Sequence, residues 1–244
     1  MATLPLLQGC QTAPRAVARA STSAAVQVDA EKPYFDPASI DLTRLLPPFP
    51  ANESSETRAE LDLMMKIQTK RSPTEAARAK DDAQASVYRF ADALGAPAGF
   101  TAQNLPLTDA LFNALRREEV GVIGVNQARF ARPRPFVLEP RLEPVIAKPA
   151  NGSYPSGHTT WARMVALVLA DMIPERRAQI LARADEYSYN RVVAGVHYPS
   201  DIDGGKLSGT VLAAALFASP RFQSDLAAAQ SELRQALNLP AQPH

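Results

Sequence analysis

The chain has 244 residues, 46% of them hydrophobic and 21% charged, so it is long enough to bury a sizeable core in one large domain or two small ones. Its 26 basic and 25 acidic residues leave a formal net charge of +1, which gives no electrostatic reason to expect a nucleic-acid partner. The single cysteine, Cys10, excludes an intramolecular disulfide and a cysteine-based zinc site, and no apolar run reaches the roughly 18 residues of a membrane span.

The first residues contain a short pattern, Leu7-Gln8-Gly9-Cys10, that has the form of a bacterial lipobox, in which the cysteine carries lipid after cleavage. A signal peptide would place basic residues and a longer apolar stretch before it. We therefore weigh lipidation of Cys10, with a start that lies upstream, against a stray cysteine in a leader. Residues 1–32 are expected to form a leader and flexible tether, and the lipobox interpretation predicts a periplasmic, lipid-anchored protein.

The stretch from Pro33 to Pro50 is rich in proline, which forbids a helix and favours an extended segment. Its leucine and phenylalanine residues fit packing along the domain surface, and a simple linker is the alternative. From Asn52 onward, apolar residues recur at helical spacing, and Ser72, Pro73 and Glu75 form a strong helix start with a capping box. The predicted helices cover about 57–70, 73–95, 108–132, 160–172, 174–190, 200–218 and 219–237.

No convincing strand or internal repeat is present in this pattern. The predicted fold class is therefore all-α: a single-domain bundle of about seven helices over residues 33–244, with the active site at helix ends. A loop of about 20 residues, rich in proline and charge, follows Arg132-Pro133-Arg134-Pro135, and loops of this length in compact domains tend to be functional.

The stretch Gly152-Ser153-Tyr154-Pro155-Ser156-Gly157-His158-Thr159 holds one of only three histidines in the chain. A glycine at a helix start allows a tight turn, and the first amides of the helix lack intrahelical partners, so the turn can bind an oxyanion. Ser156 adds a hydroxyl donor. His158 would lie beside the bound anion and could donate a proton.

A second motif contains Arg191, His197 and Asp201. A carboxylate bonded to one imidazole nitrogen fixes the tautomer and leaves the other nitrogen free to attack. Arg191 offers a planar set of donors suited to phosphate, and Arg134 is a second candidate for the same anion. Each residue alone could be structural, His158 as a satisfied buried histidine and Arg134 as a surface charge, but together they favour catalysis.

These residues resemble the type 2 phosphatidic acid phosphatase superfamily, most closely its soluble bacterial branch, the class A nonspecific acid phosphatases. The family signature has three blocks: Lys, six residues, Arg-Pro; Pro-Ser-Gly-His; and Ser-Arg, five residues, His, three residues, Asp. Gly152–Thr159 matches the class A middle block residue for residue, and Leu45-Leu46-Pro47-Pro48 resembles the segment that opens the class A domain. The resemblance covers about Leu45 to Phe222.

Two positions depart from the signature. Asn190 stands in place of the serine before Arg191, and Gln127 stands where the family has its phosphate-binding lysine. Gln127 can donate a hydrogen bond but brings no charge, and its helical neighbours at three and four residues include no lysine. Losing a charge-assisted contact to phosphate would cost roughly 1.5–3 kcal/mol. We expect weakened or retuned activity.

The resemblance implies a metal-independent acid phosphatase that hydrolyses phosphomonoesters, needs no cofactor and acts on a small phosphorylated substrate. It implies that His197 attacks phosphorus to form a phosphohistidine, that Asp201 orients His197, and that His158 protonates the leaving oxygen. It also makes a homodimer plausible. The groups that would hold the phosphate oxygens are Arg134, Arg191, Ser156, the Gly157 amide and Gln127.

Two other functions stay open on the sequence alone. One is a protein that binds phosphate or a phospholigand and has weakened or lost catalysis through Gln127. The other, ranked lower, is a vanadate-dependent haloperoxidase, whose site resembles this one, but that family also uses the lysine and its chains are generally longer.

Overall fold

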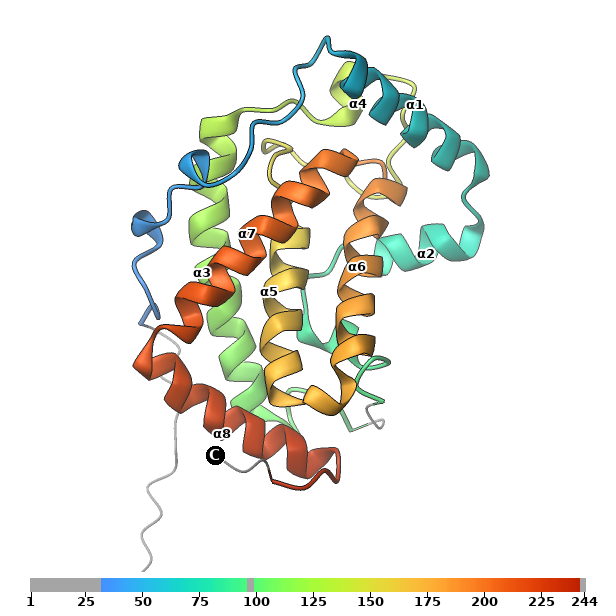
Figure 1. The fold of residues 1–244 in the computed structure, drawn as a ribbon. Helices are drawn as coiled ribbons and strands as arrows, with labels where there is room; N and C mark the ends of the chain where they lie inside the picture. Colours follow the sequence, from blue (N-terminus) through green and yellow to red (C-terminus); the bar gives the residue numbers. More distant parts are fainter. Residues whose placement is uncertain (1–31, 96–98, 242–244) are drawn as a thin grey trace, which may run out of the picture.

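Helix α5 (Gly157–Met172) runs through the middle of the fold, and the other long helices pack around it (Figure 1). The structure is a computed structural model that describes residues 32–95 and 99–241. Within these residues it contains eight α-helices and no strand, which confirms the all-α prediction. The helices are α1 (Ser55–Lys70), α2 (Pro73–Asp81), α3 (Pro106–Phe130), α4 (Pro135–Leu138), α5, α6 (Arg177–Val193), α7 (Pro199–Phe217) and α8 (Pro220–Ala236).

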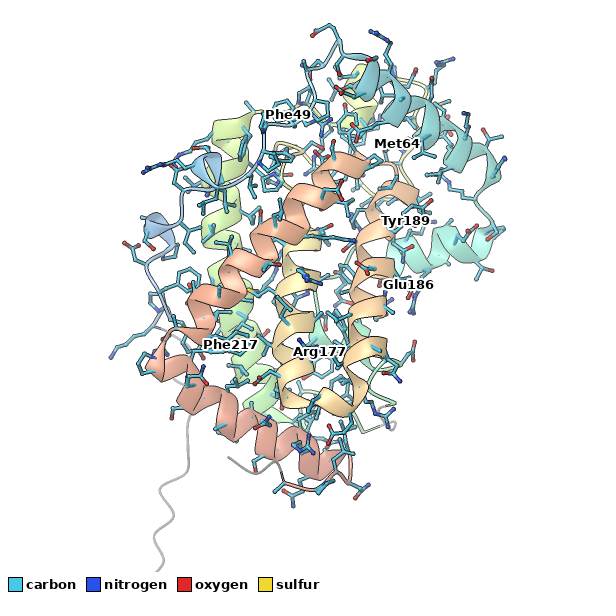
Figure 2. The ribbon with its side chains drawn as sticks, viewed as in Figure 1. Phe49, Met64, Arg177, Glu186, Tyr189 and Phe217 are labelled. Carbon is cyan, nitrogen blue, oxygen red and sulfur yellow. The ribbon has the colours of Figure 1, made fainter. Side chains whose placement is uncertain are left out.

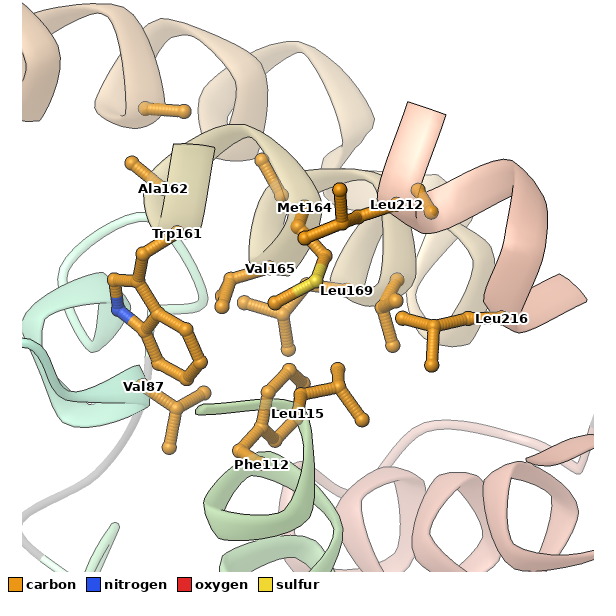
Figure 3. Packing of buried hydrophobic residues seen from close by; sticks show 14 of the residues in the cluster. Val87, Phe112, Leu115, Trp161, Ala162, Met164, Val165, Leu169, Leu212 and Leu216 are labelled. Atoms are coloured by element: carbon orange, nitrogen blue, oxygen red, sulfur yellow. The ribbon is translucent and has the colours of Figure 1, made fainter. Parts of the chain in front are cut away.

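The position of α5 follows from its composition, since most of its residues are apolar and eleven of its 16 residues are buried. A helix with this much apolar surface is stable only when other elements cover it. Trp161, Met164 and Val165 of α5 meet Phe112 and Leu115 from α3, and Leu212 and Leu216 from α7 join the same core (Figure 3). Burial of these side chains fixes the N-terminal end of α5, where the Pro-Ser-Gly-His motif lies.

Helix α7 lies very close to α5 because its contact face is made of glycine. A Cβ atom added at Gly205 would lie 2.6 Å from Thr159 Cβ and 2.8 Å from the carbonyl oxygen of Ser156. A Cβ atom added at Gly209 would lie 2.5 Å from the carbonyl oxygen of Thr160. The two glycines therefore allow α7 to lie directly against the first turn of α5.

The proline-rich segment before α1 packs on the helices and is not a free linker. Leu42 is fully buried, and Tyr154 Oη donates a hydrogen bond to the carbonyl oxygen of Pro47 at 2.8 Å. The ring of Phe49 lies 5.5 Å from that of Tyr154 and 6.4 Å from that of Phe130, measured between centroids. Figure 2 shows Phe49 beside the end of α3 that leads to the functional site.

One predicted helix is too long. Helix α2 begins at Pro73 with the expected capping box but ends at Asp81 instead of near Gly95. The chain leaves the helix at Asp82, whose carboxylate is buried against Arg183 and Asn190 of α6. A 3-10 helix, η3 (Val87–Phe90), then carries the apolar residues that the periodicity had assigned to α2.

The remaining predicted helices agree with the observed ones to within a few residues, apart from the short α4 inside the expected loop. Helix α8 closes the end of the bundle away from the motifs, and Phe217 packs on Phe222 where α7 meets α8 (Figure 2). In the parts of the chain that the structure describes, no helix is long and apolar enough to cross a membrane.

Candidate active site

A pocket of about 230 Å³ opens between the N-terminal end of α5, one face of α3, the end of α6 and the loop before α5. The signature blocks are far apart in the sequence, and the fold brings them to this one place. Among the residues that line the pocket are Gln127, Arg134, Asn151, Gly157, His158, Arg191 and His197.

Arg191 supplies the clearest sign of an anion site. Its side chain comes from the last turn of α6 and is 1% exposed. Its Nε and Nη1 atoms are buried and have no hydrogen-bond partner among the described residues. Burial lowers the pKa of this guanidinium. Because unpaired buried donors cost free energy, a guanidinium in this state can gain strongly from an oxyanion in the pocket.

Arg134 lies opposite and contacts His197 directly. Arg134 Nη1 donates a hydrogen bond to His197 Nε2 at 2.8 Å and another to the carbonyl oxygen of Val196 at 2.8 Å. Asn151 accepts two more, through its backbone oxygen at 3.0 Å and its side-chain oxygen at 2.9 Å. Burial lowers the pKa of Arg134 to about 10. Since arginine only donates, His197 Nε2 is the acceptor and carries a lone pair.

Asp201 holds the other side of the His197 ring. Its Oδ2 atom lies 3.3 Å from His197 Nδ1 and accepts hydrogen bonds from the Tyr198 amide at 2.8 Å and from Ser153 Oγ at 2.5 Å. Its Oδ1 atom accepts from Arg132 Nη1 at 2.7 Å. Burial raises the pKa of Asp201 to about 6, against the effect of Arg132. The contacts favour a proton on His197 Nδ1, which leaves Nε2 unprotonated.

His158 begins α5 beside the pocket. Its Nε2 lies 2.9 Å from the carbonyl oxygen of Ala83, and its ring stacks on Tyr187 with 6.3 Å between centroids. Burial and, to a smaller extent, the charge of Arg191 lower the pKa of His158 to about 3, so the imidazole is neutral at pH 7 without a bound anion. Burial also holds the pKa of His197 well below 6.5.

Gln127 lies in the pocket, three turns along α3 from Arg116. Its Nε2 donates to the carbonyl oxygen of Pro155 at 2.8 Å, and its Oε1 accepts from Asn151 Nδ2 at 2.5 Å. The side chain is 3% exposed in total and shares the pocket with Arg134, His158 and His197. The structure thus places Gln127 in the same pocket as the residues of the other two signature blocks. Arg129, by contrast, pairs with Asp41 outside the pocket.

Two predicted residues lie behind the pocket wall. Ser156 is fully buried, and its hydroxyl caps α5 by accepting from the Thr159 amide at 3.3 Å. Asp201 is also fully buried and reaches the pocket only through His197. Cys10 lies outside the described residues.

Sequence reasoning missed four residues. Arg132 is buried between Asp201 and Glu60. Its pairing with Asp201 joins residues 69 positions apart, and no local pattern in the sequence indicates it. Asn151 bridges Arg134 and Gln127. Arg116 and Glu119 form an ion pair on the wall of the pocket, one turn apart on α3. The helical spacing of Arg116, Glu119 and Gln127 was the available signal, since all three lie on one face of α3.

Glu119 places a carboxylate in the wall of the pocket. Glu119 is 1% exposed, and its Oε1 atom lies 3.1 Å from the point that a Cβ atom at Gly157 would occupy. Arg116 offsets this charge and also lies over the ring of Trp161, at 5.9 Å from its centroid. The described residues contain no group of three or more His, Cys, Asp or Glu side chains placed to hold a metal ion.

Comparison with known proteins identifies relatives of this chain. The model of the PAP2 superfamily matches residues 119–225. The chain is 32% identical over 236 residues to the non-specific acid phosphatase of Salmonella typhimurium. This match covers 93% of this chain and 92% of the relative. It is 30% identical over 204 residues to the non-specific acid phosphatase of Providencia stuartii, covering 80% of this chain and 81% of the relative.

Among solved structures, the chain is similar to a bacterial vanadium-dependent iodoperoxidase, with a TM-score of 0.53 and 18% identity. The match covers 71% of this chain and 51% of that chain, so this protein spans about half its length. At 18% identity, this similarity shows that the two proteins share a fold and nothing about a shared activity.

Proposed function

Because this chain belongs to the non-specific acid phosphatases of the PAP2 superfamily and is an acid phosphatase, we propose that it hydrolyses phosphomonoesters through a phosphohistidine on His197 and without a metal ion. The observation that carries the proposal is that a nucleophilic nitrogen, His197 Nε2, and a buried guanidinium, Arg191, with donors unused within the described part of the chain, line the same pocket. His197 Nε2 faces a pocket in which buried Arg191 keeps two donor atoms without partners among the described residues.

In the first step, His197 Nε2 attacks phosphorus while the bond from phosphorus to the ester oxygen breaks. Arg134 must then donate to a phosphate oxygen instead of to His197, and Arg191 gains the partners that it lacks. His158 gives a proton to the leaving oxygen, so that an alcohol departs. The negative phosphoryl group itself favours the protonated form of His158. Without it, the positive charges of Arg191 and Arg116 oppose that form.

In the second step, water attacks phosphorus, the bond to His197 breaks, and inorganic phosphate leaves. His158, now neutral, can accept the proton of the attacking water. Asp201 keeps the His197 ring in one orientation through both steps, because Arg132, Ser153 and the Tyr198 amide hold its carboxylate. Gln127 and the Gly157 amide complete the proposed set of groups around the phosphate oxygens, and Ser156, predicted as a direct contact, instead supports them from behind the pocket wall by capping the first turn of α5.

The direct test is hydrolysis of p-nitrophenyl phosphate in EDTA by the wild type and by His197→Ala. The proposal requires turnover by the wild type, loss of at least about a thousandfold in the variant, and an acid-labile phosphoenzyme in quenched wild-type reactions. Equal rates in the two proteins, or loss of wild-type activity in EDTA with recovery on adding a divalent metal, would contradict it. Thermal unfolding of the variant checks that the fold persists.

One observation favours a second candidate, a phosphate- or phospholigand-binding protein with weakened catalysis. An uncharged amide, Gln127, lines the pocket together with Arg134, Arg191 and the two histidines. Calorimetric binding of phosphate or vanadate without turnover on a broad panel of phosphate esters would favour this candidate, and efficient turnover of any of them would reject it.

The expectations about cellular context are also proposals. We propose a catalytic domain over residues 33–244, a leader over 1–32, a periplasmic location with lipid on Cys10, and a homodimer. Mass spectrometry of the N-terminal peptide from cells would detect the lipid, cell fractionation would locate the protein, and light scattering of the purified protein would give its oligomeric state.

A further inference from the structure

Helix α6 presents a row of side chains to the loop that contacts His158. Arg183, Tyr187 and Asn190 lie at helical spacing on one face of α6, and Arg191 follows directly. All four are buried. The loop after α2, residues 82–84, packs against this face, and Figure 1 shows the end of α2 beside α6.

The centre of the contact is the Asp82 carboxylate, which is fully buried. Its Oδ1 atom accepts from Arg183 Nη2 at 2.5 Å and from Arg89 Nε at 3.3 Å. Its Oδ2 atom accepts from Asn190 Nδ2 at 2.7 Å. A buried carboxylate with three donors around it can occupy only one position, so the backbone that follows it is also fixed.

The next residue of this loop, Ala83, reaches His158, and the residue after it, Gln84, is held by Tyr187. The Ala83 carbonyl oxygen lies 2.9 Å from His158 Nε2, and the Gln84 carbonyl oxygen accepts from Tyr187 Oη at 3.0 Å. Tyr187 also stacks on the His158 ring. One helix face thus holds the loop at Asp82 and at Gln84, and the carbonyl between them meets the imidazole.

A carbonyl oxygen only accepts, so His158 Nε2 must carry the proton in this contact. The other nitrogen, Nδ1, is then the one left for the substrate. A proton donor must approach the leaving oxygen within hydrogen-bond distance, so the orientation of this ring decides how well it can act. Neither Asp82 nor Asn190 lines the pocket.

We propose that Asp82 and Asn190 are positioning residues for the proton donor: through the Ala83 carbonyl they hold His158 with Nε2 protonated and Nδ1 directed at the leaving oxygen. This inference rests on the proposed function of His158. It also gives Asn190, which stands in place of the family serine, a task that a serine hydroxyl is too short to perform in the same way.

The test compares leaving groups. Asn190→Ser shortens the side chain that reaches Asp82, and Tyr187→Phe removes the hydrogen bond to Gln84 while keeping the ring. Ser188→Ala is the matched control, since it removes one buried hydrogen bond on the same helix, to the Ala184 carbonyl oxygen, away from the loop. For each protein, kcat/KM is measured with p-nitrophenyl phosphate, whose leaving group needs little protonation, and with glycerol phosphate, whose alkoxide needs a proton.

For Asn190→Ser and Tyr187→Phe we expect kcat/KM on glycerol phosphate to fall at least about tenfold more than kcat/KM on p-nitrophenyl phosphate, because general acid catalysis contributes about 10²- to 10⁴-fold. We also expect nitrogen-15 NMR shifts of His158 to show Nε2 protonated in the wild type and a mixture of tautomers in the variants. Ser188→Ala should lower both rates equally, if at all.

Equal losses on both substrates in the two variants, with unchanged His158 shifts, would overturn the inference. That outcome leaves the proposed function standing, since the wild type still turns over. Failure of the wild type to hydrolyse either ester would contradict the proposed function, and the NMR comparison would then still decide whether the cluster orients His158. If one variant does not fold, the other carries the test.

Discussion

Asn151 Nδ2 donates a hydrogen bond to Gln127 Oε1 at 2.5 Å, while the oxygens of Asn151 accept from Arg134 at 2.9 and 3.0 Å. The amide of Gln127 is therefore coupled to the Arg134 guanidinium through one intermediate side chain. The Nε2 atom of Gln127 donates a hydrogen bond to the carbonyl oxygen of Pro155, which directly precedes Ser156-Gly157-His158. The departure from the family signature thus lies inside the hydrogen-bond network of the pocket, and four predictions follow from this network and its supports.

Restoring the lysine should strengthen phosphate binding. Gln127→Lys would place an ammonium group in the pocket beside Arg134 and Arg191, and a charge-assisted hydrogen bond contributes roughly 1.5–3 kcal/mol, against about 0.5–1.5 kcal/mol for a neutral one. The inhibition constant of inorganic phosphate should fall about tenfold or more. Gln127→Met, similar in size but without a donor, is the control and should raise it. An unchanged constant in a folded Gln127→Lys protein would show that this position does not contact phosphate.

Removing the Glu119 charge should also strengthen binding. Its carboxylate is buried in the pocket wall near Gly157, where it opposes a phosphate dianion, and Arg116 offsets it only in part. In Glu119→Gln the inhibition constant of phosphate should fall about threefold to tenfold. Glu118→Gln is the control, because Glu118 is buried on another face of α3 against the Tyr34 amide and does not line the pocket. Weaker binding in Glu119→Gln alone would instead give the carboxylate a part in holding the substrate.

The two histidines should make the unliganded protein less stable in mild acid. Burial lowers the pKa of His158 to about 3 and that of His197 well below 6.5, so below pH 6.5 the unfolded chain binds protons that the folded chain does not. Each histidine then removes up to about 1.4 kcal/mol per pH unit. Asp201 acts in the opposite direction between pH 6 and 3.8, because burial raises its pKa to about 6 and the folded chain gains a proton there.

Because the two histidines outweigh Asp201, the free energy of unfolding should be lower at pH 5 than at pH 7.5. Urea unfolding at the two pH values measures the difference. His158→Gln should show a smaller difference than the wild type, and saturating phosphate should also reduce it, because a bound anion favours the protonated rings. A pH difference that is the same in His158→Gln and the wild type would contradict the assignment to this histidine.

The close contact between α7 and α5 should be sensitive to a single methyl group. In Gly205→Ala the new Cβ atom would meet Thr159 Cβ at 2.6 Å and the Ser156 carbonyl oxygen at 2.8 Å, so the first turn of α5 must shift. We expect a loss of about 1–3 kcal/mol in the free energy of unfolding. Gly124→Ala is the control, since nothing lies within 4 Å of the added atom and alanine favours a helix. Its stability should rise by about 0.5–1 kcal/mol.

Much of the fold could be predicted from local sequence. The apolar face of each long helix, the capping box at Ser72 and the prolines at helix starts are properties of neighbouring residues, and the helices formed where these signals lie. The error at α2 has the same origin. Val87 and Phe90 continue the apolar periodicity beyond Asp81, and no local signal shows that Asp82 has partners about 100 residues away on α6.

The same division holds for the site. The residues of the Pro-Ser-Gly-His motif, with Arg134, Arg191 and His197, could be chosen from the sequence because their types and spacing match the chemistry of an anion site and a nucleophile. Gln127 was singled out there as a departure from the family signature, but only the tertiary structure shows it hydrogen-bonded to Asn151 and Pro155 in the pocket. The pairing of Arg132 with Asp201, the Glu119 carboxylate in the wall and the Ala83 carbonyl on His158 were decided by packing alone. The physical reason is that these contacts join segments separated by tens of residues, and their geometry depends on how closely α3, α5, α6 and α7 pack.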